Sequence, residues 1–231
     1  NLMQKNLLKR IFISIFLLTL LFIINFSNQF IFLISILILG LIICIEANNI
    51  FAKLPETPFF TKESSNKRIN FKFLILNLLT FCYIFFVFCN FSYEIHKIKS
   101  PTLFLYIVSI CFFTDIGGYI FGKMIGGVKL TKISPSKTIS GSAGSFVFCI
   151  IPLILFLNLG YLDLKMNLNN IIFCLVISLV SQLGDLFVSF FKRKAKIKDT
   201  GKILPGHGGV LDRVDGIIFA VPISYFLLKL I

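Results

Sequence analysis

Acidic, basic and hydroxyl side chains gather near the carboxyl-terminal end of this sequence, between segments that are otherwise apolar. Asp212 and Asp215 lie three residues apart at the start of the last apolar segment, so a helix would place both carboxylates on one face. Mg²⁺ is typically held by one or two carboxylates together with phosphate oxygens. The pair therefore predicts a metal and phosphate site, although acidic residues in a first helical turn also complement the helix dipole.

A second group of polar residues precedes this pair at helical spacing. Asp185, Ser189 and Lys192 follow one another at i, i+4 and i+7, and Arg193 comes directly after Lys192. On a helix these side chains share one face, which leads out of the apolar segment to its polar end. A cationic helix end at a membrane surface would carry the same basic residues, but the carboxylate of Asp185 favours a functional face.

Two glycine-containing segments add groups that suit phosphate. Residues 132–145 combine Ser134, Lys137 and Thr138 with glycines, whose freed backbone N–H groups favour a polyphosphate. The spacing is not that of a P-loop, and a flexible polar loop is the alternative. His207 stands between glycines shortly before the acidic pair, where it could bind phosphate, orient a carboxylate or transfer a proton.

Asp115 lies about two turns inside the cytoplasmic end of another apolar segment. A carboxylate at that depth costs a few kcal/mol unless it is paired, coordinated or hydrated. Pairing with Lys123 would be a purely structural explanation. The glycines that follow Asp115 would let another helix or a ligand approach closely.

The composition places these groups in a membrane protein. The chain has 231 residues, of which 57% are hydrophobic and only 14% charged, whereas soluble domains are about a quarter charged. The sequence predicts an all-α, polytopic integral membrane helical bundle. About seven transmembrane helices are expected, near residues 11–26, 30–45, 71–91, 102–122, 144–160, 169–190 and 216–231.

The formal charge of +13 follows the positive-inside rule. Most lysines and arginines fall in the loops that are cytoplasmic if the amino terminus is cytoplasmic, and they form no nucleic-acid-binding module. Residues 1–100 are predicted to be membrane-anchoring helices. Residues 101–231 carry almost all the polar groups at unusual depth, and we expect them to form the catalytic membrane domain with a site that faces the cytoplasm.

The stretch from Ser189 to Asp215 resembles the signature of the phosphatidate cytidylyltransferase family, also called CDP-diacylglycerol synthases. The D-x-G-x-Y of residues 115–119 and the S-P-x-K-T of residues 134–138 are similar to further family features, as is Gly184-Asp185. The resemblance covers about residues 102–231. The signature positions are Ser189, Phe191, Lys192, Arg193, Lys198, Asp199, Gly201, Leu204, Pro205, His207, Gly208, Gly209, Val210, Asp212, Arg213, Val214 and Asp215.

This resemblance implies transfer of CMP from CTP to phosphatidate in a bacterial inner membrane, by a homodimer that uses Mg²⁺. It implies a catalytic set consisting of Asp185, Lys192, His207, Asp212 and Asp215, with metal ligands among Asp185, Asp212 and Asp215. Asp115 and Asp199 are accessory candidates. The residues implied to bind substrate phosphates are Ser134, Lys137, Thr138, Ser189, Arg193, Lys198 and Arg213.

Two other functions are compatible with some of these features. A related CTP-dependent membrane lipid kinase, or a cytidylyltransferase acting on another lipid, would share the membrane site but use a different acceptor. An ion transporter would line a pathway with Asp115 and Asp185. A pathway predicts polar groups through the whole membrane thickness, whereas these residues gather near one end of the apolar segments.

Overall fold

The computed structural model describes residues 2–55, 71–131, 134–160, 166–201, 203–204 and 208–230. Across these residues the protein is all-helical, with 79% helix and no β-strand. The predicted all-α fold is therefore confirmed. In chain order the helices are α1 (Leu2–Asn25), α2 (Gln29–Phe51), α3 (Phe71–Cys82), α4 (Asn90–Glu94), α5 (Pro101–Met124), α6 (Ile139–Phe148), α7 (Ile151–Leu159), α8 (Leu168–Lys194), α9 (Leu211–Val214) and α10 (Ile217–Leu230).

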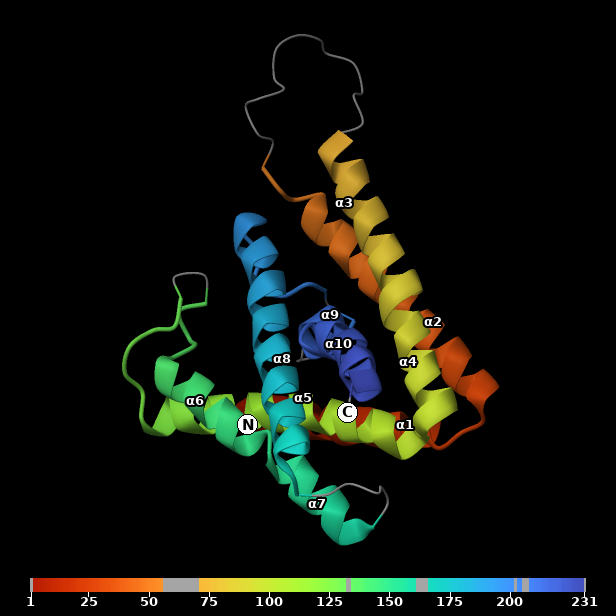
Figure 1. Ribbon diagram of the computed structural model, residues 1–231. Coiled ribbons are helices and arrows are strands. Elements are labelled where there is room, and N and C mark those ends of the chain that lie inside the picture. Colours follow the sequence, from red (N-terminus) through yellow and green to blue (C-terminus); the bar gives the residue numbers. More distant parts are fainter. Residues whose placement is uncertain are drawn as a thin grey trace, which may run out of the picture.

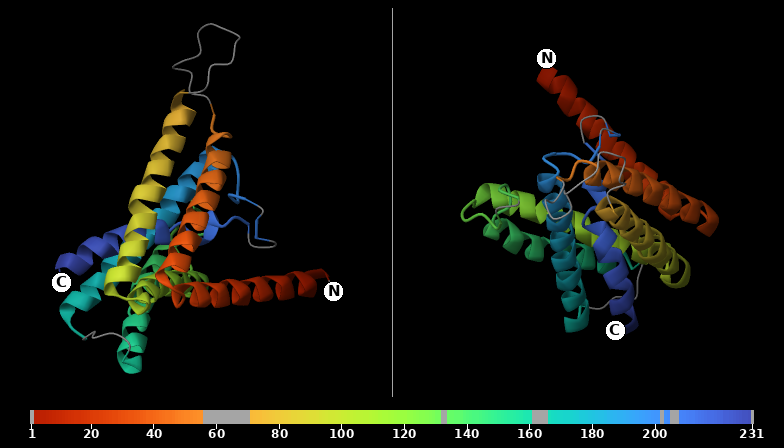
Figure 2. Two further views of the ribbon diagram at one scale, coloured as in Figure 1. Left: turned by 90° about the vertical axis from the view of Figure 1, so that its right-hand side faces the viewer. Right: turned by 90° about the horizontal axis from the view of Figure 1, so that it is seen from above.

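Helix α3 continues into α4 through the π-helical segment η2 (Tyr83–Cys89), and η3 (Ile95–Lys99) follows α4, so residues 71–99 form one helical rod. This rod and α2 run side by side along one flank of the molecule (Figures 1 and 2). On the other side, α5 crosses α8, and α6 packs along α5. Helix α1 extends away from the rest (Figure 2).

Five helical segments in the described residues are long and apolar enough to cross a membrane. The seven predicted segments coincide with helices in the described residues, but the apolar stretch Ile13–Asn25 of α1 and the 14-residue α10 are shorter than this criterion requires, so seven spans are not confirmed. Large side chains such as Phe30, Leu79 and Phe86 are exposed on the outside of the helices although the interior is also apolar. Helices that are apolar all round are typical of membrane spans, and the chain is a multi-pass membrane protein.

Polar caps fix where several of these helices begin. The side-chain oxygens of Asn28, Ser100, Thr138 and Asn167 each accept a hydrogen bond from a backbone N–H in the first turn of the following helix. Such caps satisfy donors that have no partner within the helix. The cap at position 138 also sets the start of α6 next to the residues of the site.

Candidate active site

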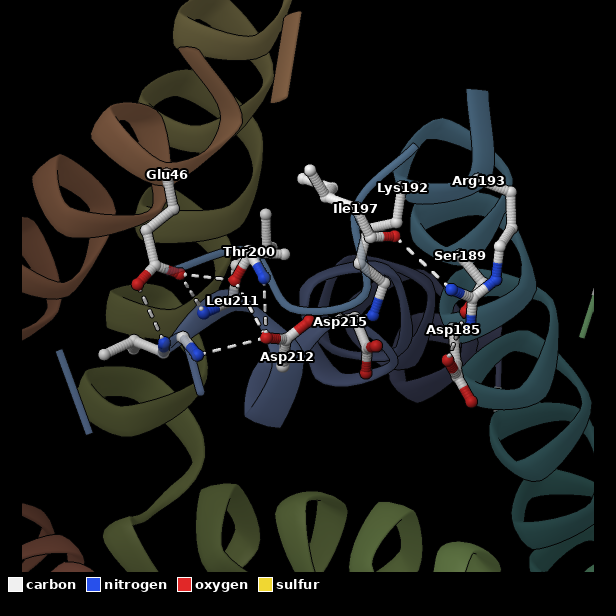
Figure 3. A network of polar contacts seen from close by, with 12 residues as sticks. Glu46, Asp185, Ser189, Lys192, Arg193, Ile197, Thr200, Leu211, Asp212 and Asp215 are labelled. Atoms are coloured by element: carbon white, nitrogen blue, oxygen red, sulfur yellow. Dashed lines mark hydrogen bonds and ion pairs between the residues drawn. The ribbon is translucent and has the colours of Figure 1, made fainter. Parts of the chain in front are cut away.

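The end of α8 carries the predicted polar face. The Ser189 hydroxyl donates to Asp185 Oδ1 at 3.2 Å, one turn away. Ser189 and Lys192 are buried although both are polar. The expectation that these residues share one face of a helix is confirmed (Figure 3).

A tight cap ends α8 and turns the chain back toward the cluster. The Ile197 N–H donates to the Lys192 carbonyl at 3.0 Å, and Lys196 between them has a φ of 54°. This left-handed residue closes the last turn as a C-cap glycine commonly does. The Arg193 guanidinium donates to the Ile197 carbonyl at 3.3 Å. The reversal brings Thr200 to the short helix α9.

Asp212 on α9 is fully engaged by protein donors. Its Oδ1 accepts from Lys192 Nζ at 2.7 Å, and the two side chains are 8% and 10% exposed. Its Oδ2 accepts from the N–H groups of Thr200 and Gly209, at 2.8 and 3.0 Å, and the Thr200 hydroxyl oxygen lies 3.1 Å from it. Burial would raise the pKa of Asp212, but Lys192 and the N–H donors outweigh burial and lower it below its ordinary value.

Asp215 follows α9 and lies beside Asp185 rather than beside Thr200 (Figure 3). A close backbone contact sets this position, because Gly184 of α8 packs against Gly216. A Cβ added to Gly184 would stand 2.8 Å from the carbonyl oxygen of Asp215. Burial and the charge of Asp185 raise the pKa of Asp215 well above its ordinary value, while the charge of Lys192 acts in the opposite direction.

The loop before α6 contributes a cation to the same place. Lys137 forms an ion pair with Asp185, and both side chains are only partly exposed. The hydroxyl of Thr138 caps α6 by accepting from the Gly141 N–H at 3.1 Å. Ser134 is buried at the start of this turn. Residues about 50 positions apart in the sequence thus meet at Asp185, as the predicted cluster requires.

Other predicted residues lie at the edge of this cluster. Arg213, Lys198 and Asp199 are exposed on α9 and on the stretch after α8. Asp115 is exposed on α5, and its charge reaches Asp215. His207 lies outside the described residues. The roles assigned to all these side chains stay predictions.

The predicted set of three metal ligands is not assembled among the described residues, which contain no group of three or more His, Cys, Asp or Glu side chains placed to hold a metal. The physical reason is that Asp212 is turned toward Thr200, Gly209 and Lys192, which occupy both its oxygens. Asp185 and Asp215 instead bring two like charges together, an arrangement that a divalent cation would relieve. These two residues fit a metal.

Glu46 is a residue of this site that the sequence reasoning missed. It lies on α2 and is 1% exposed. Its carboxylate accepts from the Thr200 hydroxyl at 2.8 Å and from the N–H groups of Val210 and Leu211 at 3.0 and 2.8 Å (Figure 3). The available signal was a single carboxylate in the apolar run of residues 41–51, at a depth where such groups are rare.

The fold and the polar cluster define a multi-pass membrane protein with a charged site at the end of α8. A family model described as "Cytidylyltransferase family" matches residues 8–231, and the chain belongs to this family. The resemblance drawn from the sequence motifs is confirmed.

Two relatives, both named phosphatidate cytidylyltransferase, come from Staphylococcus aureus (strain COL) and Staphylococcus epidermidis (strain ATCC 12228). This chain is 42% identical to the first over 168 residues and 39% identical to the second over 167. Each match covers 71% of this chain and 62% of the relative. The chain thus spans less than two thirds of the length of these relatives.

Proposed function

We propose that the protein transfers CMP from CTP to phosphatidate, which yields CDP-diacylglycerol and pyrophosphate. The observation that carries this proposal is the meeting of two lysines, a hydroxyl and three carboxylates at one end of the membrane helices, in a chain of the cytidylyltransferase family. Two anionic substrates, one of which keeps its acyl chains in the bilayer, need cationic groups at such a place. The names of the two relatives support the same reaction.

The proposed reaction joins two anions, so charge neutralisation and alignment are the main tasks of the site. An oxygen of the phosphatidate phosphate forms a bond to the α-phosphorus of CTP, and the bond from that phosphorus to the β-phosphate oxygen breaks. A phosphate monoester has a second pKa of about 6 and is largely anionic at neutral pH, so the nucleophile needs no strong general base. Lys137 and Lys192 supply positive charge, and Ser189 supplies a hydroxyl donor.

We also propose that Asp185 and Asp215 hold Mg²⁺, which when bound would neutralise phosphate charge. The fit rests on the two buried or half-buried carboxylates that face each other. Most lysines and arginines lie in loops on one side of the predicted spans, as the positive-inside rule requires of cytoplasmic loops. On this basis the proposal places the site and the amino terminus on the cytoplasmic side of a bacterial inner membrane. The proposal also includes a homodimer, and this part is supported only by the family resemblance.

The test uses the purified protein in detergent micelles with phosphatidate, Mg²⁺ and CTP labelled at the α-phosphate. The label is expected in the lipid extract, and the same reaction with γ-labelled CTP is expected to leave the lipid unlabelled. Transfer of the γ-label to diacylglycerol or a polyprenol would identify a kinase and overturn the proposal. Absence of any lipid label with every one of these acceptors would overturn it as well.

Two perturbations test the metal. An excess of chelator is expected to abolish incorporation. Asp215→Asn is expected to lower the turnover by on the order of 100-fold, as for loss of one electrostatic stabiliser. Glu94→Gln also replaces a carboxylate by an amide, but on α4, far along the chain from the cluster, and it is expected to keep normal turnover. Unchanged incorporation in chelator would refute the metal assignment while leaving the reaction class standing.

A further inference from the structure

Glu46 connects α2 to the segment that carries most of the predicted site. Its side chain accepts three hydrogen bonds and lies almost entirely out of solvent. All three donors come from positions 200, 210 and 211, more than 150 residues further along the chain. Burying a carboxylate without partners costs a large amount of free energy. The three donors offset this cost for Glu46.

A chain of contacts leads from Glu46 to the lysine of the cluster. The Thr200 hydroxyl lies 2.8 Å from Glu46 Oε2 and 3.1 Å from Asp212 Oδ2. The Thr200 N–H holds the same Asp212 oxygen at 2.8 Å. The other oxygen of Asp212 holds Lys192 Nζ at 2.7 Å. Glu46 therefore fixes Thr200, Thr200 fixes Asp212, and Asp212 fixes the ammonium group beside Asp215.

Two glycines of the signature fit this arrangement. A Cβ added to Gly201 or to Gly209 would overlap the carboxylate of Glu46. The backbone at these two positions thus lies directly against the Glu46 side chain, and a larger residue at either one would force that side chain to move. This explains in steric terms why glycine occupies positions 201 and 209, and it shows that both residues pack directly against Glu46.

We propose that Glu46 is a positioning residue for the proposed reaction: it holds Thr200, Val210 and Leu211 so that Asp212 sets Lys192 in the place where the substrate phosphates bind. The inference rests on the proposed function. It assigns α2, which is expected to be a membrane anchor, a direct part in forming the site. Glu46 itself touches no predicted substrate group and acts only through Thr200 and Asp212.

Glu46→Gln is the first test. A glutamine amide can still accept from one backbone N–H, but its NH₂ group would face a second donor and break that contact. We expect kcat to fall about tenfold to one-hundredfold, as for loss of one charge-assisted hydrogen bond. KM for CTP and phosphatidate should change less than about threefold, because the change affects the placement of Lys192 rather than the number of groups that bind substrate. Glu94→Gln is the matched control.

A second readout does not depend on activity. Partial amine labelling followed by peptide mass spectrometry measures how readily each lysine reacts. In Glu46→Gln, labelling of Lys192 should rise severalfold, whereas Lys137, which pairs with Asp185, should label as in the wild type. General loosening of the fold would raise both. Equal rises, or no rise at Lys192, would overturn the inference.

Thr200→Val covers the case in which Glu46→Gln does not fold. It removes the hydroxyl that joins Glu46 to Asp212 but keeps the shape, and Thr200→Ser retains the hydroxyl as its control. Valine should reproduce the selective rise at Lys192 and serine should not. If the wild type transfers no CMP, the proposed function fails, while the labelling of these variants still decides whether Glu46 sets Lys192.

Discussion

The pair Lys192–Asp212 allows a quantitative prediction for Asp212→Asn. The two side chains are about nine-tenths buried, with 2.7 Å between Nζ and Oδ1. Breaking a buried pair by removing one partner typically costs about 3–5 kcal/mol. An asparagine could keep the N–H donors of Thr200 and Gly209 on its oxygen. Its NH₂ group would then face the ammonium group.

We expect the lower end of this range, about 3 kcal/mol, because Lys192 can turn toward the neighbouring Asp215. For a chain of this size one kcal/mol corresponds to about 2–4 °C in Tm, so the apparent Tm should fall by about 10 °C. The double variant Lys192→Met with Asp212→Asn removes the stranded charge as well. It should melt several degrees above the Asp212→Asn single variant, since an uncharged pair of groups avoids the desolvation cost.

Thiol chemistry provides the assay. The chain has no Trp, but Cys89, Cys111, Cys149 and Cys174 are buried and unpaired. A dye that fluoresces on reaction with thiols therefore reports unfolding in detergent as the temperature rises, at one fixed scan rate. Asp199 is an exposed acidic residue in the stretch after α8, and Asp199→Asn should leave the Tm within about 2 °C of the wild-type value.

Two results would contradict the role assigned to the Lys192–Asp212 pair. A wild-type Tm in Asp212→Asn would mean that the ion pair contributes nothing to the folded state. A double variant that melts below both single variants would mean that the two side chains act independently. Either result would remove the basis for treating Asp212 as the holder of Lys192.

Three further changes probe the packing around the site with the same thermal assay. Gly209→Ala places a Cβ against the Thr200 hydroxyl, and the Tm should fall by several degrees, as expected for about 1–3 kcal/mol of overpacking. Lys196→Gly removes a left-handed non-glycine residue at the end of α8 and should raise the Tm by about 2–4 °C. Ser142→Ala removes a 2.6 Å hydrogen bond to Gln182 and should lower the Tm by about 2–4 °C. A change of opposite sign in any one would contradict the local geometry from which it is derived.

Local spacing allowed part of the site to be predicted from the sequence. Asp185, Ser189 and Lys192 share a face because helix periodicity alone requires it, and the apolar residues around them leave no doubt about a helix. The signature placed Asp212 and Asp215 near this face. It did not show that Asp212 faces Lys192 whereas Asp215 faces Asp185, because side-chain direction at α9 depends on the preceding loop.

The contribution of α2 could not be read from local spacing. The predicted second span ended at residue 45, whereas α2 continues to Phe51 and carries Glu46 near its end. The three donors to Glu46 are 154, 164 and 165 positions away, and no periodicity connects such distant segments. The contact of Lys137 with Asp185 is of the same kind. Both contacts arise from how the helices pack, and the local spacing of residues in one sequence does not reveal that packing.

The placement of Asp185 beside Asp215 follows from glycines that the acidic motif alone does not explain. Gly184 precedes Asp185 and Gly216 follows Asp215, and a Cβ added to Gly216 would lie 2.9 Å from the Ser181 carbonyl oxygen. Backbone packing therefore forces two like charges together, and burial together with the charge of Asp185 raises the pKa of Asp215. A pair that came together only when a ligand bound would not need glycine at both positions. The two carboxylates are held in place by the contact between α8 and the start of α10, so a cation or a proton would meet a pair that is already in position.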